Sequence, residues 1–280
     1  MGGFLCYNES HRKTSGCGAG WRVRQHGFVS LRHGGCEAAE TANATGRMRE
    51  NMDLLVTGIE SAYGRKKVLQ GVSLAAETGQ CVGLVGANGC GKSTLLGILA
   101  GLRRPDAGSI LFDGKSAAEK DLIRCTGYVP QESNLIGELS VRDNLLLWYG
   151  GRAALEEAFR QEFLHRLGVE QLCRVRVDRL SGGMKKKVSI VCALAGNPPI
   201  LLLDEPGAAL DLPGKNELRN FLCWHKSRGG TVLLATHDES ELSVCDRIFV
   251  LHNGTSREID RTLRGDDLTQ IIQTPHSGRM

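Results

Sequence analysis

The first part of the chain lacks the hydrophobic pattern of a folded domain. Residues 1–51 are rich in Gly, Ser, Thr, Asn, Arg and His, and no apolar period of 2 or 3.6 persists in them. We expect a disordered N-terminal extension. Met48 and Met52 are alternative start points, and with either of them the preceding residues would be an artefact of gene prediction.

From Met52 onward the pattern changes to that of a folded body. Apolar residues first alternate with polar ones, as in a half-buried strand, and continuous apolar runs follow at 81–85, 200–203 and 231–235. Such runs are typical of strands that are buried on both faces of a parallel sheet. Because helical stretches separate them, we expect an α/β fold with a mainly parallel sheet.

Two further segments lie within or after this body. Residues 137–187 contain no strand-like run, and their apolar residues recur at helical spacing, which predicts a helical subdomain inserted in the α/β core. We expect the folded domain to extend over 52–256. The remaining residues, 257–280, are predicted to be a polar tail that frays.

Composition limits the binding partners and the cellular locations that we expect for the protein. The 280 residues are 41% hydrophobic and 24% charged, with a formal net charge of +4, which is too weak to argue for nucleic-acid binding. No run approaches the roughly 18 apolar residues that a spanning helix needs, and the apolar start is too short for a signal peptide. The ten cysteines form no C-x-x-C pair, so we expect reduced thiols in a cytoplasmic protein.

The strongest motif is a glycine-rich loop between a buried strand and a helical run. Residues 86–94 read Gly-Ala-Asn-Gly-Cys-Gly-Lys-Ser-Thr and match G-x-x-x-x-G-K-[ST]. Glycines let the backbone turn tightly and point its N–H groups inward, and the helix N-terminus adds positive charge, so a triphosphate fits. Lys92 would reach the β- and γ-phosphates, Ser93 would hold Mg²⁺, and Thr94 would donate to the α-phosphate. The other loop residues predicted to bind the nucleotide are Gly86, Asn88, Gly89, Cys90 and Gly91.

A second motif places two carboxylates at the end of a buried strand. Asp204 and Glu205 follow the run 200–203, and they would lie beside the phosphate loop if both strands belong to one parallel sheet. Asp204 would bind the metal through water, and Glu205 would orient and polarise the attacking water. Alone this signal is weak, since many strands end in acidic turns.

The pentapeptide Leu-Ser-Gly-Gly-Met at 180–184 stands between these two motifs. A phosphate loop, this pentapeptide and an acidic strand, in that order, resemble the ATP-binding cassette (ABC) family, over about 52–254. The resemblance implies a P-loop NTPase core with a small antiparallel β subdomain beside the helical one. It also implies that two copies pair head to tail, so that Ser181, Gly182 and Gly183 of one copy cap the γ-phosphate bound by Lys92 of the other.

The resemblance implies roles for four more residues. Tyr63 matches the aromatic residue that stacks on adenine, and Gln131 the residue that senses metal and water. His237 would contact the γ-phosphate. Asp211, which closes the run that follows the acidic strand, is expected to contribute to nucleotide binding. Outside this context, Tyr63 could be a turn aromatic, Gln131 a solvated loop residue, and His237 a structural histidine.

Three features near the motifs depart from the usual pattern or lie outside it. Met184 stands where the family usually has Gln, and Gly207 where Ser or Thr is common. The lysine run 185–187 could add positive charge near the phosphate or cover a solvated helix face, and the solvated face is favoured.

Two functions fit these motifs. In the first, the chain is the ATP-hydrolysing subunit of an exporter-type transporter, peripheral at the inner face of the cell membrane, where residues 131–150 dock on a membrane-spanning partner. In the second, a soluble ABC ATPase drives a cytosolic assembly or regulatory complex. A chromosome or repair ATPase would need a long heptad insertion, which the interval between the motifs is too short to contain.

Overall fold

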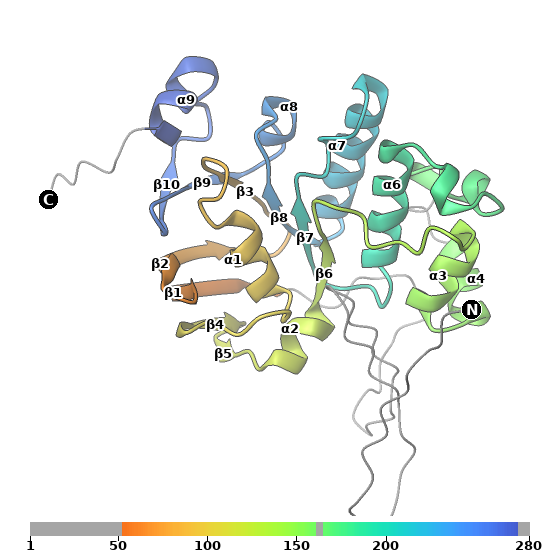
Figure 1. Ribbon diagram of the computed structural model, residues 1–280, viewed down its shortest axis with the longest axis horizontal. Coiled ribbons are helices and arrows are strands. Elements are labelled where there is room, and N and C mark those ends of the chain that lie inside the picture. The colour runs from red at the N-terminus through yellow and green to blue at the C-terminus, as the bar shows by residue number, and fades with distance from the viewer. Residues whose placement is uncertain (1–51, 161–164, 274–280) are drawn as a thin grey trace, which may run out of the picture.

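The computed structural model describes residues 52–160 and 165–273. The predicted disordered extension over 1–51 lies outside these residues. Two sheets form the body of the molecule, and helices flank them (Figure 1). The strands are β1 (Leu54–Tyr63), β2 (Lys66–Ala76), β3 (Cys81–Val85), β4 (Ala107–Phe112), β5 (Lys115–Ser116), β6 (Thr126–Val129), β7 (Ile200–Asp204), β8 (Thr231–Ala235), β9 (Arg247–His252) and β10 (Thr255–Ile259). The α-helices are α1 (Lys92–Leu99), α2 (Glu119–Cys125), α3 (Val141–Tyr149), α4 (Arg152–Phe159), α6 (Gly182–Ala193), α7 (Leu212–Ser227), α8 (Glu239–Leu242) and α9 (Gly265–Gln273).

The larger sheet has six strands in the order β10-β9-β3-β8-β7-β6. Five of them are parallel, and β10 pairs antiparallel with β9. The smaller sheet, β2-β1-β4-β5, is antiparallel throughout. This arrangement confirms the predicted fold class, and the three predicted buried strands are β3, β7 and β8, which are buried at every residue.

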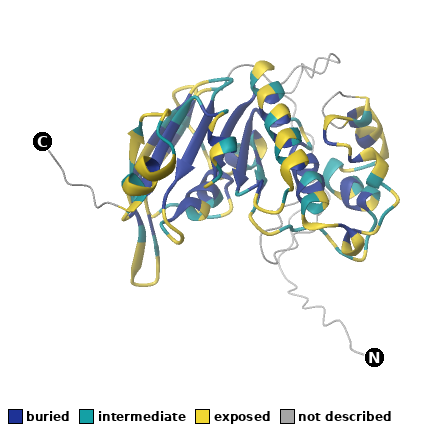
Figure 2. Cartoon of the chain, turned by 90° about the horizontal axis from the view of Figure 1, so that it is seen from above, coloured by how far each residue is buried: buried dark blue, intermediate teal, exposed yellow. Residues whose placement is uncertain are grey.

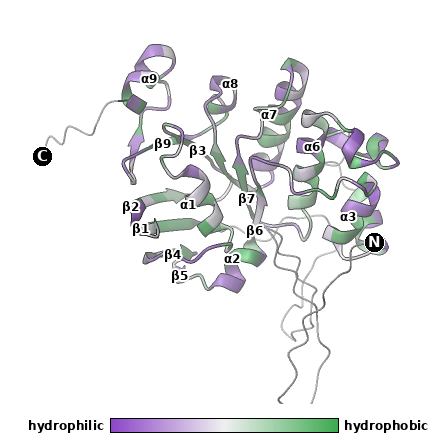
Figure 3. Ribbon diagram, viewed as in Figure 1, coloured by the Kyte–Doolittle hydropathy of each residue, from purple (hydrophilic) through white to green (hydrophobic). Residues whose placement is uncertain are grey.

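The strands of the larger sheet are mostly buried (Figure 2) and β3 and β7 are hydrophobic (Figure 3). Alternation along these strands divides the core into two layers. In β7, Leu201 and Leu203 pack in the cluster that contains α6 and α7, whereas Ile200 and Leu202 pack in the cluster that contains α1 and the small sheet. Successive side chains of a strand point to opposite faces, so a strand covered on both faces must be apolar at every position.

The segment between β6 and β7 is helical in the described residues. It contains α3, α4, two 3₁₀ turns (Glu170–Leu172 and Val177–Arg179) and α6. Leu145, Leu155 and Leu167 are buried at the centre of this part. Ser140 caps α3 by accepting a hydrogen bond from the backbone N–H of Asp143 at 3.1 Å.

The C-terminal region is more ordered than its polar composition predicts. Strand β10 extends to Ile259, and α9 follows it and packs on β9. Leu268 of α9 is buried, and Ile271 and Ile272 pack against the same core cluster. Their spacing of three and four residues forms one apolar helix face, and the polar residues around it hide that face in the composition. The described part of the chain contains no helix that could cross a membrane.

Candidate functional site

The phosphate loop connects β3 to α1, where the sheet presents the carboxyl ends of its parallel strands (Figure 1). The backbone of Gly86 has φ 154°, and a Cβ atom there would lie 2.4 Å from the carbonyl oxygen of Leu251. Gly91 has φ 112°, and its Cβ would lie 2.6 Å from a methyl group of Leu69. Backbone geometry therefore favours glycine at both positions, and at Gly86 the close backbone carbonyl also leaves no space for a side chain.

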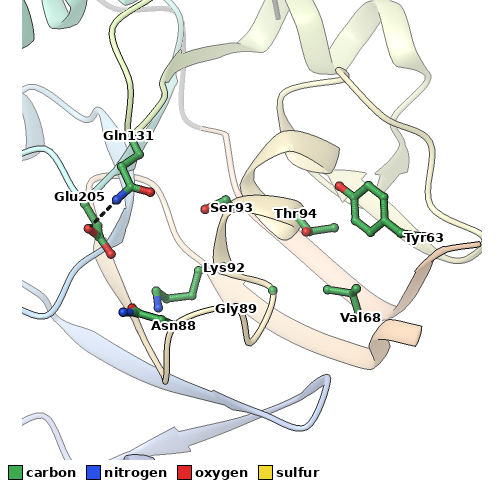
Figure 4. A pocket seen from close by; sticks show the side chains of 10 residues that line it. Tyr63, Val68, Asn88, Gly89, Lys92, Ser93, Thr94, Gln131 and Glu205 are labelled. Carbon is green, nitrogen blue, oxygen red and sulfur yellow. Dashed lines mark hydrogen bonds between the residues drawn. The ribbon is translucent and has the colours of Figure 1, made fainter. Parts of the chain in front are cut away.

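A cavity of about 380 Å³ opens over this loop (Figure 4). Most of its lining consists of residues that the sequence predicted: Tyr63, Asn88, Gly89, Gly91, Lys92, Ser93, Thr94, Gln131 and Glu205. Val68 also lines it and was not predicted. Val68 follows the turn after Tyr63, and its apolar side chain carries no chemical signal that sequence analysis would single out.

The Lys92 side chain is buried at the start of α1. Its ammonium donates to the carbonyl oxygens of Gly86 at 2.7 Å and Ala87 at 3.3 Å, and it lies 3.1 Å from Nε2 of His237. Helix α1 has no side-chain cap, so its first N–H groups are available to an anion. A buried cation at a helix N-terminus is a phosphate-binding arrangement.

Glu205 lies across the cavity from the loop, and its neighbours hold it in place. Its carboxylate accepts a hydrogen bond from Nε2 of Gln131 at 3.1 Å and lies 3.7 Å from Nε2 of His237. Its φ is 45°, in the left-handed region that a non-glycine residue rarely adopts. The backbone N–H of Glu205 donates to Ala235 at 2.8 Å, which helps to hold this conformation. Strain of this kind is common at functional sites.

His237 follows β8, the strand between β3 and β7, so it lies between the loop and Glu205. Burial lowers its pKa, and the neighbouring Lys92 cation lowers it further, against the opposing charge of Glu205. These effects favour the neutral imidazole, which can donate from one nitrogen and accept at the other.

Asp204 and Ser93 provide the oxygen atoms that a magnesium ion would need. Asp204 is 2% exposed, and burial raises its pKa, although a hydrogen bond from Ser93 opposes that shift. Mg²⁺ prefers hard oxygen ligands and is often held by one or two protein groups plus water and phosphate. The carboxylate, the hydroxyl and the amide oxygen of Gln131 fit such an ion.

Tyr63 stands at the outer end of the cavity, 54% exposed. The guanidinium of Arg103 lies 4.0 Å from the centre of its ring, and Arg103 donates to Ser61 at 3.0 Å. This contact places the guanidinium over one face of the ring. Stacking of Tyr63 on a base stays a prediction.

Some predicted site residues do not lie in the cavity. Cys90 directs its side chain into the core, so only its backbone could contact a nucleotide. Ser181, Gly182 and Gly183 lie at the N-terminus of α6, where they do not line the cavity. Asp211 caps α7, because its side chain accepts from the N–H of Gly214 at 2.9 Å. Roles for these residues toward nucleotide stay predictions.

The lysine run 185–187 is not a solvated face. Lys186 is 4% exposed, and Lys187 forms an ion pair with Glu217. Sequence analysis missed Lys186, although a signal exists: it stands three, four and seven residues before Ser189, Ile190 and Ala193, which are all buried.

Fold and site together define a nucleotide-binding domain of the phosphate-loop class. The family model described as "ABC transporter" matches residues 69–208. The chain is 36% identical over 202 residues to Nod factor export ATP-binding protein I of Burkholderia orbicola, which is 70% of this chain and 66% of that protein. It is 38% identical over 219 residues to the sulfate/thiosulfate import ATP-binding protein CysA of Bordetella parapertussis, which is 74% of this chain and 62% of that protein. This chain therefore belongs to the ABC transporter family.

Solved structures agree with this assignment. A dimeric ATP-binding cassette in a post-hydrolysis state, bound to ADP and Pi, matches with a TM-score of 0.66 and 29% identity, covering 76% of this chain and 99% of that one. The ATP-binding subunit of an ABC transporter matches with a TM-score of 0.67 and 31% identity, covering 78% and 97%. The matched region spans about two thirds of the curated relatives' own length.

Proposed function

We propose that this chain binds ATP with Mg²⁺ and hydrolyses it. The observation that carries the proposal is the meeting of Lys92, Glu205 and His237 around one cavity, with 3.1 Å between Lys92 and His237 and 3.7 Å between His237 and Glu205. A cation, a carboxylate and an imidazole at a phosphate-binding helix N-terminus fit phosphoryl transfer to water.

Each residue has a defined task in this proposal. Glu205 accepts a proton from the attacking water, and Gln131 orients the Glu205 carboxylate through its amide. Lys92 neutralises charge on the β- and γ-phosphates, and His237 positions the γ-phosphate. Mg²⁺, held by Ser93, Asp204 and Gln131, would supply charge neutralisation on the phosphates.

Two copies complete the site by pairing head to tail. Ser181 accepts from the backbone N–H of Met184 at 3.2 Å, and the glycines that follow begin α6 with exposed or half-exposed backbone. A second glycine-rich helix N-terminus suits the γ-phosphate held by another copy. The dimeric state of the similar ADP-bound cassette supports this pairing.

Transport through a separate membrane-spanning partner is the purpose we propose, with the chain peripheral at the inner face of the cell membrane. The names of the similar proteins, which are transporter subunits, support it. Relatives named for export and for import match to similar extents, so the preference for export rests on Met184 and the lysines after it. Leu147, 52% exposed on α3, and Ile136, 37% exposed, offer apolar surface for docking.

The test of hydrolysis is Glu205→Gln in the full chain. Loss of a general base typically costs about 10²- to 10⁴-fold, so turnover should fall in that range while ATP binding is retained. The control is Glu119→Gln, since Glu119 forms a surface pair with Arg104 outside the site. Near-normal turnover of Glu205→Gln, measured as phosphate release, would refute the role of Glu205.

The partner is tested with the same variant. Tagged Glu205→Gln should stay closed on ATP and retain its partner during purification from detergent-solubilised native cells. A polytopic membrane protein in stoichiometric yield would support transport. Recovery of soluble partners alone would instead support an ATPase that drives a cytosolic assembly.

A further inference from the structure

Lys186 occupies an unusual position for a lysine. It lies on α6, is 4% exposed, and donates from its ammonium to the carbonyl oxygens of Pro130 at 2.9 Å and Gln131 at 2.8 Å. Its neighbours Lys185 and Lys187 are half-buried, and Lys187 pairs with Glu217. Lysine is almost never fully buried unless its charge is compensated, so this position requires an explanation.

The surrounding charges give part of that explanation. Burial lowers the pKa of Lys186, and the negative charges of Asp204 and Glu205 oppose that shift, with Glu241 adding to them. The ammonium is therefore a buried cation in the field of the two carboxylates that end β7.

The hydrogen bonds of Lys186 give the rest of the explanation for its buried position. Gln131 accepts from Lys186 with its backbone oxygen and donates to Glu205 with its side-chain amide at 3.1 Å. Gln131 is therefore held at two points. Lys186 restrains its main chain, and the Glu205 carboxylate binds its side-chain amide. The pairing of β6 with β7, which brings Val129 opposite Leu203, sets the separation that this connection spans.

We propose that Lys186 is a positioning residue for ATP hydrolysis. It restrains the main chain at 130–131 so that the Gln131 amide stays on the Glu205 carboxylate. Because Lys186 stands on α6, the helix that Ser181 caps, it also connects this site to the surface offered to a second copy. The inference rests on the proposed role of Glu205 in catalysis.

If Lys186 served folding alone, its positive charge would not be needed. A methionine of similar length would fill the same space without the cost of burying an ammonium, and replacing a buried charge by a packed apolar residue is often neutral or stabilising. Positioning instead depends on donors at the Pro130 and Gln131 oxygens. An arginine can supply such donors, and a methionine cannot.

The experiment compares Lys186→Met, Lys186→Arg and the matched control Lys185→Met in the full chain. Steady-state ATP hydrolysis gives kcat and KM, titration with a fluorescent ATP analogue gives Kd, and thermal unfolding gives Tm. For Lys186→Met we expect kcat to fall about 10- to 100-fold, because small misplacements of catalytic groups cost that much. The Kd and KM of Lys186→Met should stay within about twofold of the wild-type values. Lys186→Arg should have at least about a third of the wild-type kcat.

The outcomes separate this inference from the proposed function. A kcat for Lys186→Met equal to that of Lys185→Met, in a wild type that hydrolyses ATP and loses turnover on Glu205→Gln, overturns the inference alone. A loss of kcat that follows a lower Tm and is not recovered by Lys186→Arg also overturns it, since stability would then carry the effect. A wild-type dimer without ATP hydrolysis would overturn both.

Should Lys186→Met fail to fold, Lys186→Gln serves as the second variant. Glutamine keeps a donor amide but loses the charge and reaches less far, so we expect an intermediate kcat with unchanged Kd. A wild-type kcat for Lys186→Gln would count against the inference.

Discussion

Helices α1 and α6 both have glycines at their N-termini, just before α1 and in the first turn of α6, and they differ in what lies around those N-termini. In α1 the first residue is the buried Lys92, no side chain caps the helix, and the cavity lies directly in front of it. In α6 the Ser181 hydroxyl caps the helix from an exposed position, and the residues at its start do not line that cavity. Two similar local sequences therefore form different sites: one faces a pocket of its own chain, and the other faces outward.

The two helix starts differ in backbone conformation and in surroundings. Gly91 before α1 is left-handed, with φ 112°, whereas Ser181 before α6 is extended, with φ −64°. The α1 turn is enclosed by the small sheet and the end of β9, which provide the Leu69 methyl and the Leu251 carbonyl against Gly91 and Gly86. The glycines of the α6 turn lie against the loop after β7, since a Cβ at Gly182 would lie 3.2 Å from Ala209 and one at Gly183 would lie 3.1 Å from the Ala209 carbonyl oxygen. An anion at α1 would be surrounded by protein, whereas an anion at α6 needs a second surface to exclude water.

The largest effect is expected at α1. Lys92→Met removes the buried cation there, so ATP affinity should fall at least about 100-fold, in line with the cost of losing one partner of a buried charge pair. Titration with a fluorescent ATP analogue measures it, with Lys185→Met as the control. An affinity within about threefold of wild type would show that α1 is not the ATP site.

A selective effect is expected at α6. Ser181→Arg places a bulky side chain on the outward-facing turn, so one copy should bind ATP as before while ATP-dependent dimerisation is lost and hydrolysis falls about 10- to 100-fold. Light scattering with and without ATP reports the dimer. If ATP binding by the single copy fell as it does in Lys92→Met, the two helix starts would not be separate sites.

The smallest effect concerns the loop that runs from Glu205 to the start of α7. Its Gly207 leaves room for Glu241, which is fully buried, since a Cβ at Gly207 would lie 1.7 Å from a carboxylate oxygen of Glu241. Burial raises the pKa of Glu241 from 4.5 to about 7, against lowering contributions from the Thr236 hydroxyl, Lys215 and the Gly207 N–H.

The raised pKa of Glu241 makes the folded state less stable as the pH rises. Between pH 4.5 and about 7 the folded state binds more protons at Glu241 than the unfolded state, so its contribution to stability is present below pH 4.5 and is lost as the pH rises through 7. His225 acts oppositely: burial lowers its pKa to about 4, so its contribution is lost as the pH falls from 6.5 to 4.

Glu241→Gln should therefore gain stability relative to wild type as the pH rises from 4.5 to about 7, by at most about 3 kcal/mol. Urea unfolding across this pH range measures the difference, and Glu239→Gln, an exposed neighbour on α8, is the control. A difference between Glu241→Gln and wild type that does not change with pH would mean that this carboxyl does not titrate in that window.

Much of the core could be predicted because its signals are local. The apolar runs of β3, β7 and β8 predict strands buried on both faces, and the glycines with Lys92, Ser93 and Thr94 predict a phosphate loop. Both signals lie within about ten residues, where side-chain type and backbone preference are coupled directly. The order of motifs along the chain also predicted the family.

Tertiary structure decided what depends on partners far along the chain. Gln131 and Glu205 are 74 residues apart and meet because β6 and β7 are adjacent in the sheet. Lys186 is buried because α6 packs on the core, so a run of three lysines was mistaken for a solvated face. The order of the α9 region depends on its apolar face meeting β9. Local sequence sets the conformation that a segment favours, whereas long-range packing decides which side chains lose water and acquire partners.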